Sequence, residues 1–205
     1  MPRVLLTGFE PFGGDELNSS WEAVRLVGQE PPAGLEVSVV RLDCVFGRAL
    51  EQLSAAIHET DPDLVVCVGQ ASGRPDITVE RVAINLDEAR IPDNAGVSRH
   101  GTPVVAGGPT AYFSALPVKA CVAAVRAAGV PASLSYTAGT FVCNHVFYGL
   151  MHCIATKRPG MRGGFVHVPA LPDLPAATVA EGLRALLTTA VRTREDIAMP
   201  AGETH

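Results

Sequence analysis

Five consecutive apolar residues, Leu64–Val68 (LVVCV), constrain the fold more than any other feature of the sequence. A run this short and this apolar is typical of a central strand that is covered on both faces. Strands of that kind belong to parallel sheets, in which a helix usually connects one strand to the next. The rest of the chain should therefore alternate short strands with amphipathic helices.

Such an alternation extends along the chain. Strands are predicted at Arg3–Phe9, Glu36–Leu42, Leu64–Val68, Ile77–Asn85, Ala132–Thr137 and Gly163–Val168. Helices are predicted to begin near Asn18 or Ser19, Phe46, Val118, Cys143 and Val179, because apolar residues recur there at helical spacing. The pattern predicts one α/β domain over residues 1–205, a sandwich with a mainly parallel central sheet, and a polar tail from 192 to 205 that frays.

Functional sites in such sheets form where the strands end. Ligands bind in the crevice outside the carboxyl ends of the strands. The rule indicates three loops in this chain, residues 8–17, 69–76 and 138–142.

The charge balance excludes several classes of function. The 205 residues carry 16 Lys and Arg against 21 Asp and Glu, a net charge of −5, so no basic surface is available to bind nucleic acid. The least polar long stretch, 115–134, contains Lys119 and Arg126 and does not resemble a membrane span. The first seven residues lack the apolar region of a signal peptide, so we expect a cytoplasmic protein without a membrane partner.

The five cysteines do not form a disulfide or zinc pattern. Their number is odd, their spacing is irregular and no CxxC pair occurs. Cys67 lies in an apolar strand and Cys121 on the apolar stripe of a helix, so both are predicted to be core residues.

Cys143 differs from the other four cysteines in its position. It follows a strand, a Gly-containing turn and an aromatic residue, at the point where a helix should begin. The positive end of a helix dipole lowers the pKa of a thiol, and free backbone N–H groups there can hold an oxyanion. These properties favour a nucleophile, although a capping or core cysteine would fit the same position.

A thiol nucleophile needs a base, and the base needs an orienting partner. His145 is two residues from Cys143, and residues two apart on a helix do not face each other. His167 lies near the carboxyl end of a strand and is the better candidate, unless it is an ordinary hydrogen-bonded strand histidine. Glu80 is a carboxylate among apolar residues, which suits the orienting acid or equally an ion pair with Arg81 or another arginine.

Metal and phosphate sites are poorly supported. Cys143, His145, His152 and Cys153 do not have zinc-ligand spacing, and a helix would scatter them around its circumference. The Gly-rich stretch from Thr7 lacks the GK[ST] ending of a phosphate loop. No metal or cofactor is expected.

Several long motifs resemble those of the pyroglutamyl-peptidase I family of cysteine peptidases, and the resemblance covers about Val4 to Pro172. The motifs are LLTGFEPFGG from Leu5, GRPDITVERVAINLDEARIPDN from Gly73, AGTFVCN from Ala138 and GFVHVPALP from Gly164. The resemblance implies a three-layer α/β/α sandwich, often assembled as a homotetramer. It also implies a single peptidase domain.

The same resemblance implies roles for particular residues. Cys143 would be the nucleophile, His167 the general base and Glu80 the orienting acid, the three residues already reached from their positions. Arg90 matches an arginine near the oxyanion site. The remaining matches line the pocket: Phe9 and Phe12, with Phe141 as a further candidate, for the faces of the substrate ring, and Asn18 and Gln70 for its lactam.

The implied reaction is hydrolysis of an N-terminal pyroglutamyl residue from a peptide, through a thioester on Cys143. A blocked N-terminus has no ammonium group, so it needs an apolar pocket rather than a charged one. Two other functions stay open from the residues alone. One is a transferase or nucleoside phosphorylase-like enzyme on a similar scaffold, and the other is a binding module or redox sensor that uses Cys143.

Overall fold

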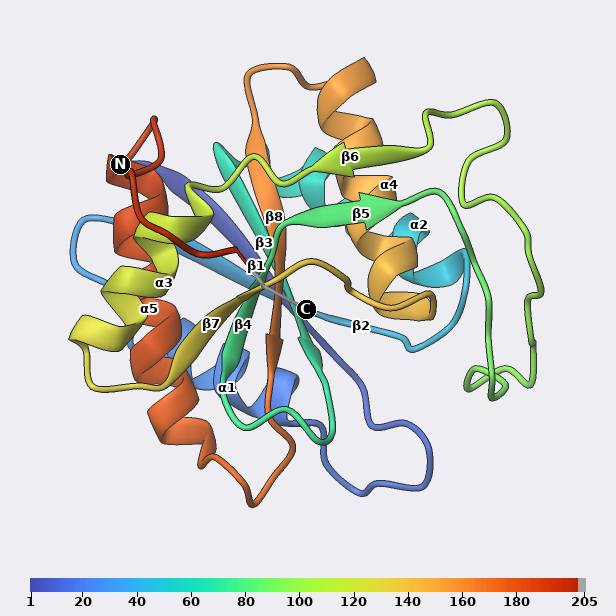
Figure 1. Ribbon diagram of the computed structural model, residues 1–205, viewed down its shortest axis with the longest axis horizontal. Coiled ribbons are helices and arrows are strands. Elements are labelled where there is room, and N and C mark those ends of the chain that lie inside the picture. Colours follow the sequence, from blue (N-terminus) through green and yellow to red (C-terminus); the bar gives the residue numbers. More distant parts are fainter. Residues whose placement is uncertain (203–205) are drawn as a thin grey trace.

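The chain folds into three layers, with a six-stranded sheet between two layers of helices (Figure 1). The computed structural model describes residues 1–202. The strands are β1 (Arg3–Phe9), β2 (Glu36–Leu42), β3 (Leu64–Gln70), β4 (Ile77–Glu80), β5 (Val82–Ile84), β6 (Ala111–Phe113), β7 (Ala132–Ser135) and β8 (Arg162–Val168). The helices are α1 (Ser19–Gln29), α2 (Arg48–Thr60), α3 (Val118–Ala127), α4 (Val142–Thr156) and α5 (Ala176–Arg192). The predicted α/β/α sandwich is confirmed.

The strand order of the central sheet is β2-β1-β3-β8-β4-β7. The first four strands of this order are parallel, whereas β4 is antiparallel to β8 and β7 is parallel to β4. The sheet is therefore mainly parallel, as predicted, but β4 and β7 run in the opposite direction to the others. The predicted strand Leu64–Val68 is the centre of β3, and all seven residues of β3 are buried.

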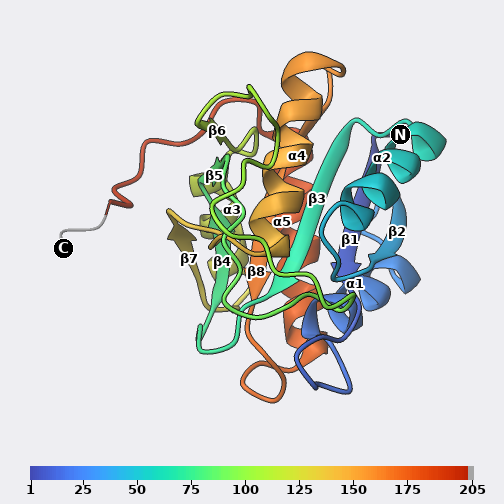
Figure 2. The ribbon, with the colours of Figure 1, turned by 90° about the vertical axis from the view of Figure 1, so that its right-hand side faces the viewer.

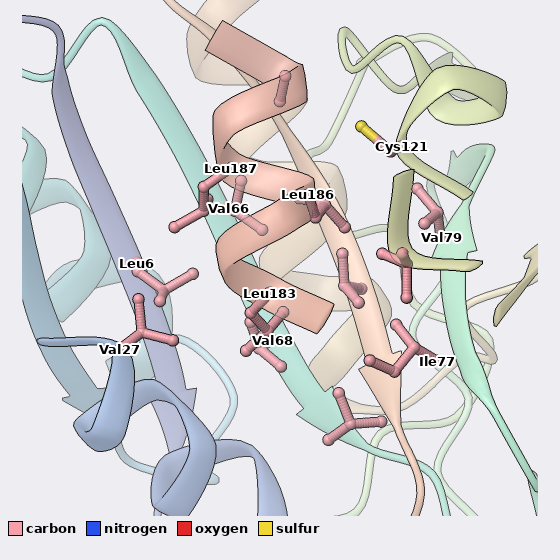
Figure 3. Packing of buried hydrophobic residues seen from close by; sticks show 14 of the residues in the cluster. Leu6, Val27, Val66, Val68, Ile77, Val79, Cys121, Leu183, Leu186 and Leu187 are labelled. Atoms are coloured by element: carbon pink, nitrogen blue, oxygen red, sulfur yellow. The ribbon is translucent and has the colours of Figure 1, made fainter. Parts of the chain in front are cut away.

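Helices cover both faces of this sheet, and alternate residues of each strand contact opposite layers. α1, α3 and α5 pack on one face, and α2 and α4 on the other (Figure 2). On the first face, Leu183 and Leu187 of α5 pack over Val66 and Val68 of β3 (Figure 3). Cys67, between those two valines in sequence, is buried in the opposite core, so its predicted core role is confirmed.

The predicted strand Ile77–Asn85 was wrong as a single element. It divides at Arg81 into β4 of the central sheet and β5, which pairs with β6 in a separate two-stranded sheet. The Arg81 N–H donates to the carbonyl of Ser135, whereas its carbonyl accepts from the N–H of Ser114. The backbone therefore changes its strand partner at Arg81. The alternation of apolar side chains in the sequence does not reveal this change.

Local hydrogen bonds explain two element boundaries. Asn18 caps α1, with its Oδ1 accepting from the Ser20 N–H at 3.0 Å, so Asn18 rather than Ser19 is the N-cap. α2 begins at Arg48, so Phe46 precedes the helix instead of opening it.

The segment after α5, which was predicted to fray, makes defined contacts up to residue 201. Asp196 accepts hydrogen bonds from the N–H groups of Lys119 and Ala120 at the start of α3. Tyr136 donates to the carbonyl of Ala201. Residues 203–205 of the predicted tail lie outside the described residues.

Candidate active site

Cys143 is the second residue of α4, as its sequence position predicts. The helix begins at Val142, and the preceding residue, Phe141, has extended backbone angles. The first N–H groups of a helix have no partner within the helix, so those around Cys143 are available to an acceptor in front of the helix. Cys143 as a residue is half-buried, and its thiol points inward.

Gly69 of β3 makes room for the Cys143 sulfur. A Cβ atom at residue 69 would lie 2.8 Å from Cys143 Sγ and 2.9 Å from the ring of Phe165. Gly69 is also the register partner of His167 on the neighbouring strand β8. The sulfur therefore lies over the position next to His167, on the face of the sheet that α4 covers. The structure brings together the two residues predicted to be nucleophile and base.

His167 and Glu80 form a buried hydrogen-bonded pair. His167 Nδ1 lies 2.7 Å from Glu80 Oε1, and the two residues are 4% and 0% exposed. The pair forms because β4 is antiparallel to β8: Thr78 is the register partner of His167, and Glu80, two residues further, points to the same face. A carboxylate can only accept, so in a neutral His167 ring the proton lies on Nδ1 and Nε2 has the free lone pair.

The arginine that pairs with Glu80 is Arg74, which sequence reasoning did not single out. Its guanidinium donates to Glu80 Oε1 at 2.6 Å and to Thr78 Oγ1 at 2.5 Å. The predicted ion pair with another arginine is therefore confirmed, and the same carboxylate also contacts a histidine. Arg81, the neighbour in sequence, instead lies over the ring of Phe113 and 3.8 Å from Asp196. The sequence analysis included Arg74 only through the general expectation that Glu80 could pair with an arginine other than Arg81.

The electrostatics of the thiol differ from the prediction. Burial raises the pKa of Cys143 well above its usual value; the negative charge of Glu80 raises it further, and the positive charge of Arg74 opposes the shift. The helix N-terminus had predicted a lowered pKa. A thiol in this environment is neutral at pH 7, so a base must remove its proton as the sulfur reacts.

Aromatic side chains pack in the same core as Cys143. Phe12 and Phe141 pack with ring centroids 6.2 Å apart, and Phe46, which was not predicted as a site residue, meets Phe141 edge-on at 5.3 Å. Phe9 lies deeper, 2% exposed, with its ring 6.4 Å from that of Phe165. The three predicted pocket aromatics therefore lie on this side of the sheet, in one packed core together with Phe46 and Cys143.

Asn18 and Gln70 are buried, and both amides are hydrogen-bonded within the protein. Gln70 Oε1 accepts from the N–H and hydroxyl of Ser19, and its Nε2 donates to Asp15. Asn18 Oδ1 accepts from Ser20, and its Nδ2 donates to the carbonyl of Glu10. These bonds fix the loop after β1 against the end of β3. Each amide nitrogen retains one N–H that these bonds do not use.

Arg90 is exposed, in the segment that runs beside the approach to α4. Nearby, the hydroxyl of Thr140 donates to the carbonyl of Glu88, and the N–H of Glu88 donates to the carbonyl of Thr140. These two bonds hold the segment of Arg90 next to the residues that precede Cys143.

A second buried carboxylate–histidine pair lies close by. His145 Nδ1 is 2.9 Å from Asp87 Oδ2, and Arg99 donates to the same oxygen at 2.7 Å. His145 Nε2 accepts from the N–H of Gly47, which precedes α2. Both ring nitrogens of His145 are therefore occupied by partners other than Cys143.

The structure offers no metal centre and no membrane span in the part that it describes. Within residues 1–202, no group of three or more His, Cys, Asp or Glu side chains is arranged to hold a metal ion. Over the same residues, none of the helices combines the length and the apolar character that crossing a bilayer requires.

Comparison with known proteins identifies the family of the chain. A family model described as pyroglutamyl peptidase matches residues 2–197. The pyrrolidone-carboxylate peptidase of Streptomyces coelicolor is 60% identical, with the whole of both chains covered, and that of Bacillus cytotoxicus is 46% identical, again over both whole chains. The crystal structure of pyroglutamyl peptidase I from Bacillus amyloliquefaciens superposes with a TM-score of 0.95 at 44% identity and covers 97% of this chain and 99% of that chain. The chain therefore belongs to the pyroglutamyl peptidase family, a family of cysteine peptidases.

Proposed function

We propose that the protein removes N-terminal pyroglutamate from peptides, with Cys143, His167 and Glu80 as a catalytic triad. The observation that supports this proposal most strongly is the Cys143 sulfur above Gly69, beside the buried His167–Glu80 pair. A nucleophile, a base and a group that orients the base are then held by three separate elements.

The proposed reaction has two halves. His167 Nε2 takes the thiol proton while Cys143 Sγ attacks the pyroglutamyl carbonyl, and backbone N–H groups at the start of α4, together with Arg90, stabilise the oxyanion. The intermediate collapses to a thioester when the C–N bond breaks, and the leaving amine takes the proton from His167. His167 then removes a proton from water, the hydroxide attacks the thioester, and the thiol and pyroglutamate are released.

The proposed substrate group is a flat, neutral ring, which suits the aromatic and amide side chains near Cys143. Phe12 and Phe141 would contact the faces of the lactam, with Phe9 beneath, and the remaining N–H groups of Asn18 and Gln70 would donate to its carbonyl. A site built to hydrogen-bond a substrate group rejects an analogue that lacks the group by roughly 10⁴-fold. We therefore expect N-terminal proline, which has no ring carbonyl, to be a very poor substrate.

We also propose a cytoplasmic location and a homotetramer. All five cysteines are free, which is compatible with a reducing compartment. The tetramer rests on the family resemblance, and light scattering on a size-exclusion column tests it directly.

The decisive experiment uses a chromogenic pyroglutamyl amide. We expect wild-type protein to hydrolyse it, iodoacetamide to abolish turnover, and EDTA to leave turnover unchanged. Cys143→Ala should be inactive, whereas Cys153→Ala, a matched change at another half-buried cysteine, should retain activity. Wild-type rates in Cys143→Ala would refute the proposal.

The same assay separates the alternatives. Turnover that requires added phosphate would favour a phosphorylase-like enzyme. A protein that forms a reversible Cys143 oxidation product but hydrolyses no pyroglutamyl amide would favour a redox sensor.

A further inference from the structure

Arg74 makes three contacts with the machinery around Glu80 without belonging to the triad. It lies between β3 and β4, and its side chain is 27% exposed. One terminal nitrogen donates to Glu80 Oε1 and to Thr78 Oγ1, and the other donates to the carbonyl of Thr137 at 2.9 Å. The planar guanidinium suits this arrangement, because its two terminal nitrogens point in different directions and together reach three acceptors.

The Glu80 carboxylate depends on this arginine. Glu80 is fully buried, its Oε2 has no hydrogen-bond partner within residues 1–202, and its Oε1 is shared between Arg74 and His167. A buried carboxylate without a cation is strongly destabilised in its charged form. Among the described residues, Arg74 and His167 form ion pairs with Glu80. Arg74 carries a permanent positive charge, whereas His167 is charged only when it is protonated.

Arg74 also reaches the segment that leads to the nucleophile. Thr137, whose carbonyl it binds, follows β7 and lies six residues before Cys143, and the Ser135 hydroxyl donates to the same carbonyl. One guanidinium therefore connects the strand that carries the orienting acid to the chain that enters α4. The positive charge of Arg74 also acts on the Cys143 thiol, because it lowers the pKa that the negative charge of Glu80 raises.

We propose that Arg74 is a positioning residue that holds the Glu80 carboxylate aimed at His167, and fixes the Thr137–Cys143 segment relative to it. Arg74 acts through Glu80 and does not touch the substrate. The inference rests on the proposed function.

The test compares Arg74→Gln, Arg74→Lys and Arg74→Ala with a matched control, Arg81→Gln. Arg81 is adjacent to Glu80 in sequence but pairs with Asp196, so its loss should leave the kinetics unchanged. For each variant, kcat and KM for a pyroglutamyl amide are measured across pH. Urea unfolding of each variant checks that the variant is folded at the assay temperature.

We expect Arg74→Gln to lower kcat about 10- to 100-fold with little change in KM, since a misplaced catalytic group costs about that much. Arg74→Lys should recover only part of kcat, because an ammonium group lacks the planar fork that reaches all three acceptors. Added guanidinium should rescue Arg74→Ala. A wild-type kcat in Arg74→Gln, or no rescue, would overturn the proposal.

A second readout does not depend on turnover. In protein with ¹⁵N-labelled histidine, the proton on His167 Nδ1 should give a far-downfield resonance, assigned by its absence in His167→Asn. We expect Arg74→Gln to shift or broaden this resonance and Arg81→Gln to leave it in place. If wild-type protein fails to cleave the amide, the proposed function fails, whereas the resonance still decides whether Arg74 holds the Glu80–His167 pair.

Discussion

Gly69 shows how one missing side chain provides space for a reacting atom. Residues before it in β3 point alternately to the two cores, and residue 69 points at the Cys143 sulfur. Its backbone angles are not those that require glycine, so the requirement is the space above its Cα and not the conformation. A methyl group would meet the sulfur on one side and the buried Phe165 ring on the other.

We therefore predict that Gly69→Ala lowers kcat about 100-fold, the order of loss expected when a nucleophile is displaced by about 1 Å. The kinetics of pyroglutamyl amide hydrolysis measure this effect. Gly160→Ala is the control, because no atom lies within 4 Å of a Cβ at that residue. Equal activity in both variants would show that the sulfur does not occupy the space above Gly69.

The Cys143 thiol gives a prediction in pH. Burial raises its pKa well above the usual value, so the fraction of reactive thiolate in free enzyme should be small at pH 7 and grow as the pH rises. We expect the rate of alkylation by iodoacetamide to keep increasing above about pH 8.5, the pKa of an ordinary thiol. Labelling in Cys143→Ala gives the background from the other cysteines. A rate that reaches a plateau below pH 7 would show instead that the helix N-terminus and His167 stabilise a thiolate.

At the scale of elements, α4 is fixed at its first turn by the His145–Asp87 pair. His145 links the helix to Asp87 and to the N–H of Gly47, while Arg99 neutralises the same carboxylate. Phe46, next to Gly47, packs edge-on against the His145 ring at 5.4 Å and against Phe141 at 5.3 Å. The polar pair thus supports both the helix of the nucleophile and part of the aromatic wall.

We predict that His145→Ala lowers the free energy of unfolding by about 2 kcal/mol, since the N–H of Gly47 loses its acceptor and the buried Asp87 carboxylate keeps only Arg99 as a partner. Urea unfolding at pH 7 measures the loss. His58→Ala, at an exposed position of α2, should change the stability by less than about 0.5 kcal/mol. A loss below about 1 kcal/mol in His145→Ala would mean that water replaces the missing hydrogen bonds.

Most elements could be predicted from sequence because their apolar patterns are local. The buried run of β3 predicts a strand that is covered on both faces. The apolar stripes of α3 and α5 predict which side of each helix packs on the sheet. The change of sheet at Arg81 could not be predicted, because it depends on backbone partners at Ser135 and Ser114. The direction of β7 likewise depends on its pairing with β4, which runs antiparallel to β8. The loop 138–142 reaches the site as expected. However, β7 runs opposite to β3 and β8 and does not end at the same edge of the sheet as those strands.

The site itself divides in a similar way. Cys143 and His167 could be singled out by position, at the start of a helix and near the carboxyl end of a strand, and Glu80 because it is a carboxylate among apolar residues. Arg74 and Phe46 could not, since an arginine or a phenylalanine in a loop has many ordinary roles and only the fold brings these two to the site. The direction of the thiol pKa was also missed, because burial depends on residues distant in sequence.

For the molecule as a whole, buried thiols make stability sensitive to alkali. Burial raises the pKa of Cys44, Cys67 and Cys121 to about 12. In the unfolded chain these thiols ionise near pH 8.5. Between those values the unfolded state binds fewer protons than the folded state, so stability is unaffected below about pH 8.5 and falls as the pH rises toward 12.

We predict a loss of up to about 1.4 kcal/mol per pH unit for each such thiol above pH 9, measured by urea unfolding at a series of pH values. Cys121→Ala should make the decline less steep by the share of one thiol. Val125→Ala, which also truncates a buried residue of α3, should lower stability at every pH and leave the slope unchanged. Identical slopes in wild type and Cys121→Ala would contradict the prediction.

The position of β8 in the sheet has a consequence for how the chain comes to be active. β8 is the last strand in sequence, yet it lies between β3 and β4 and joins two groups of strands that have no other pairing with each other. It also carries His167, which is 87 residues from Glu80. A chain emerging from the ribosome therefore contains Cys143 before it contains His167, and the two groups of strands cannot pair into one sheet until β8 has been made. On the proposed function, a copy that ends before β8 would lack the base and could not cut peptides, because the strand that joins the two halves of the sheet also carries His167.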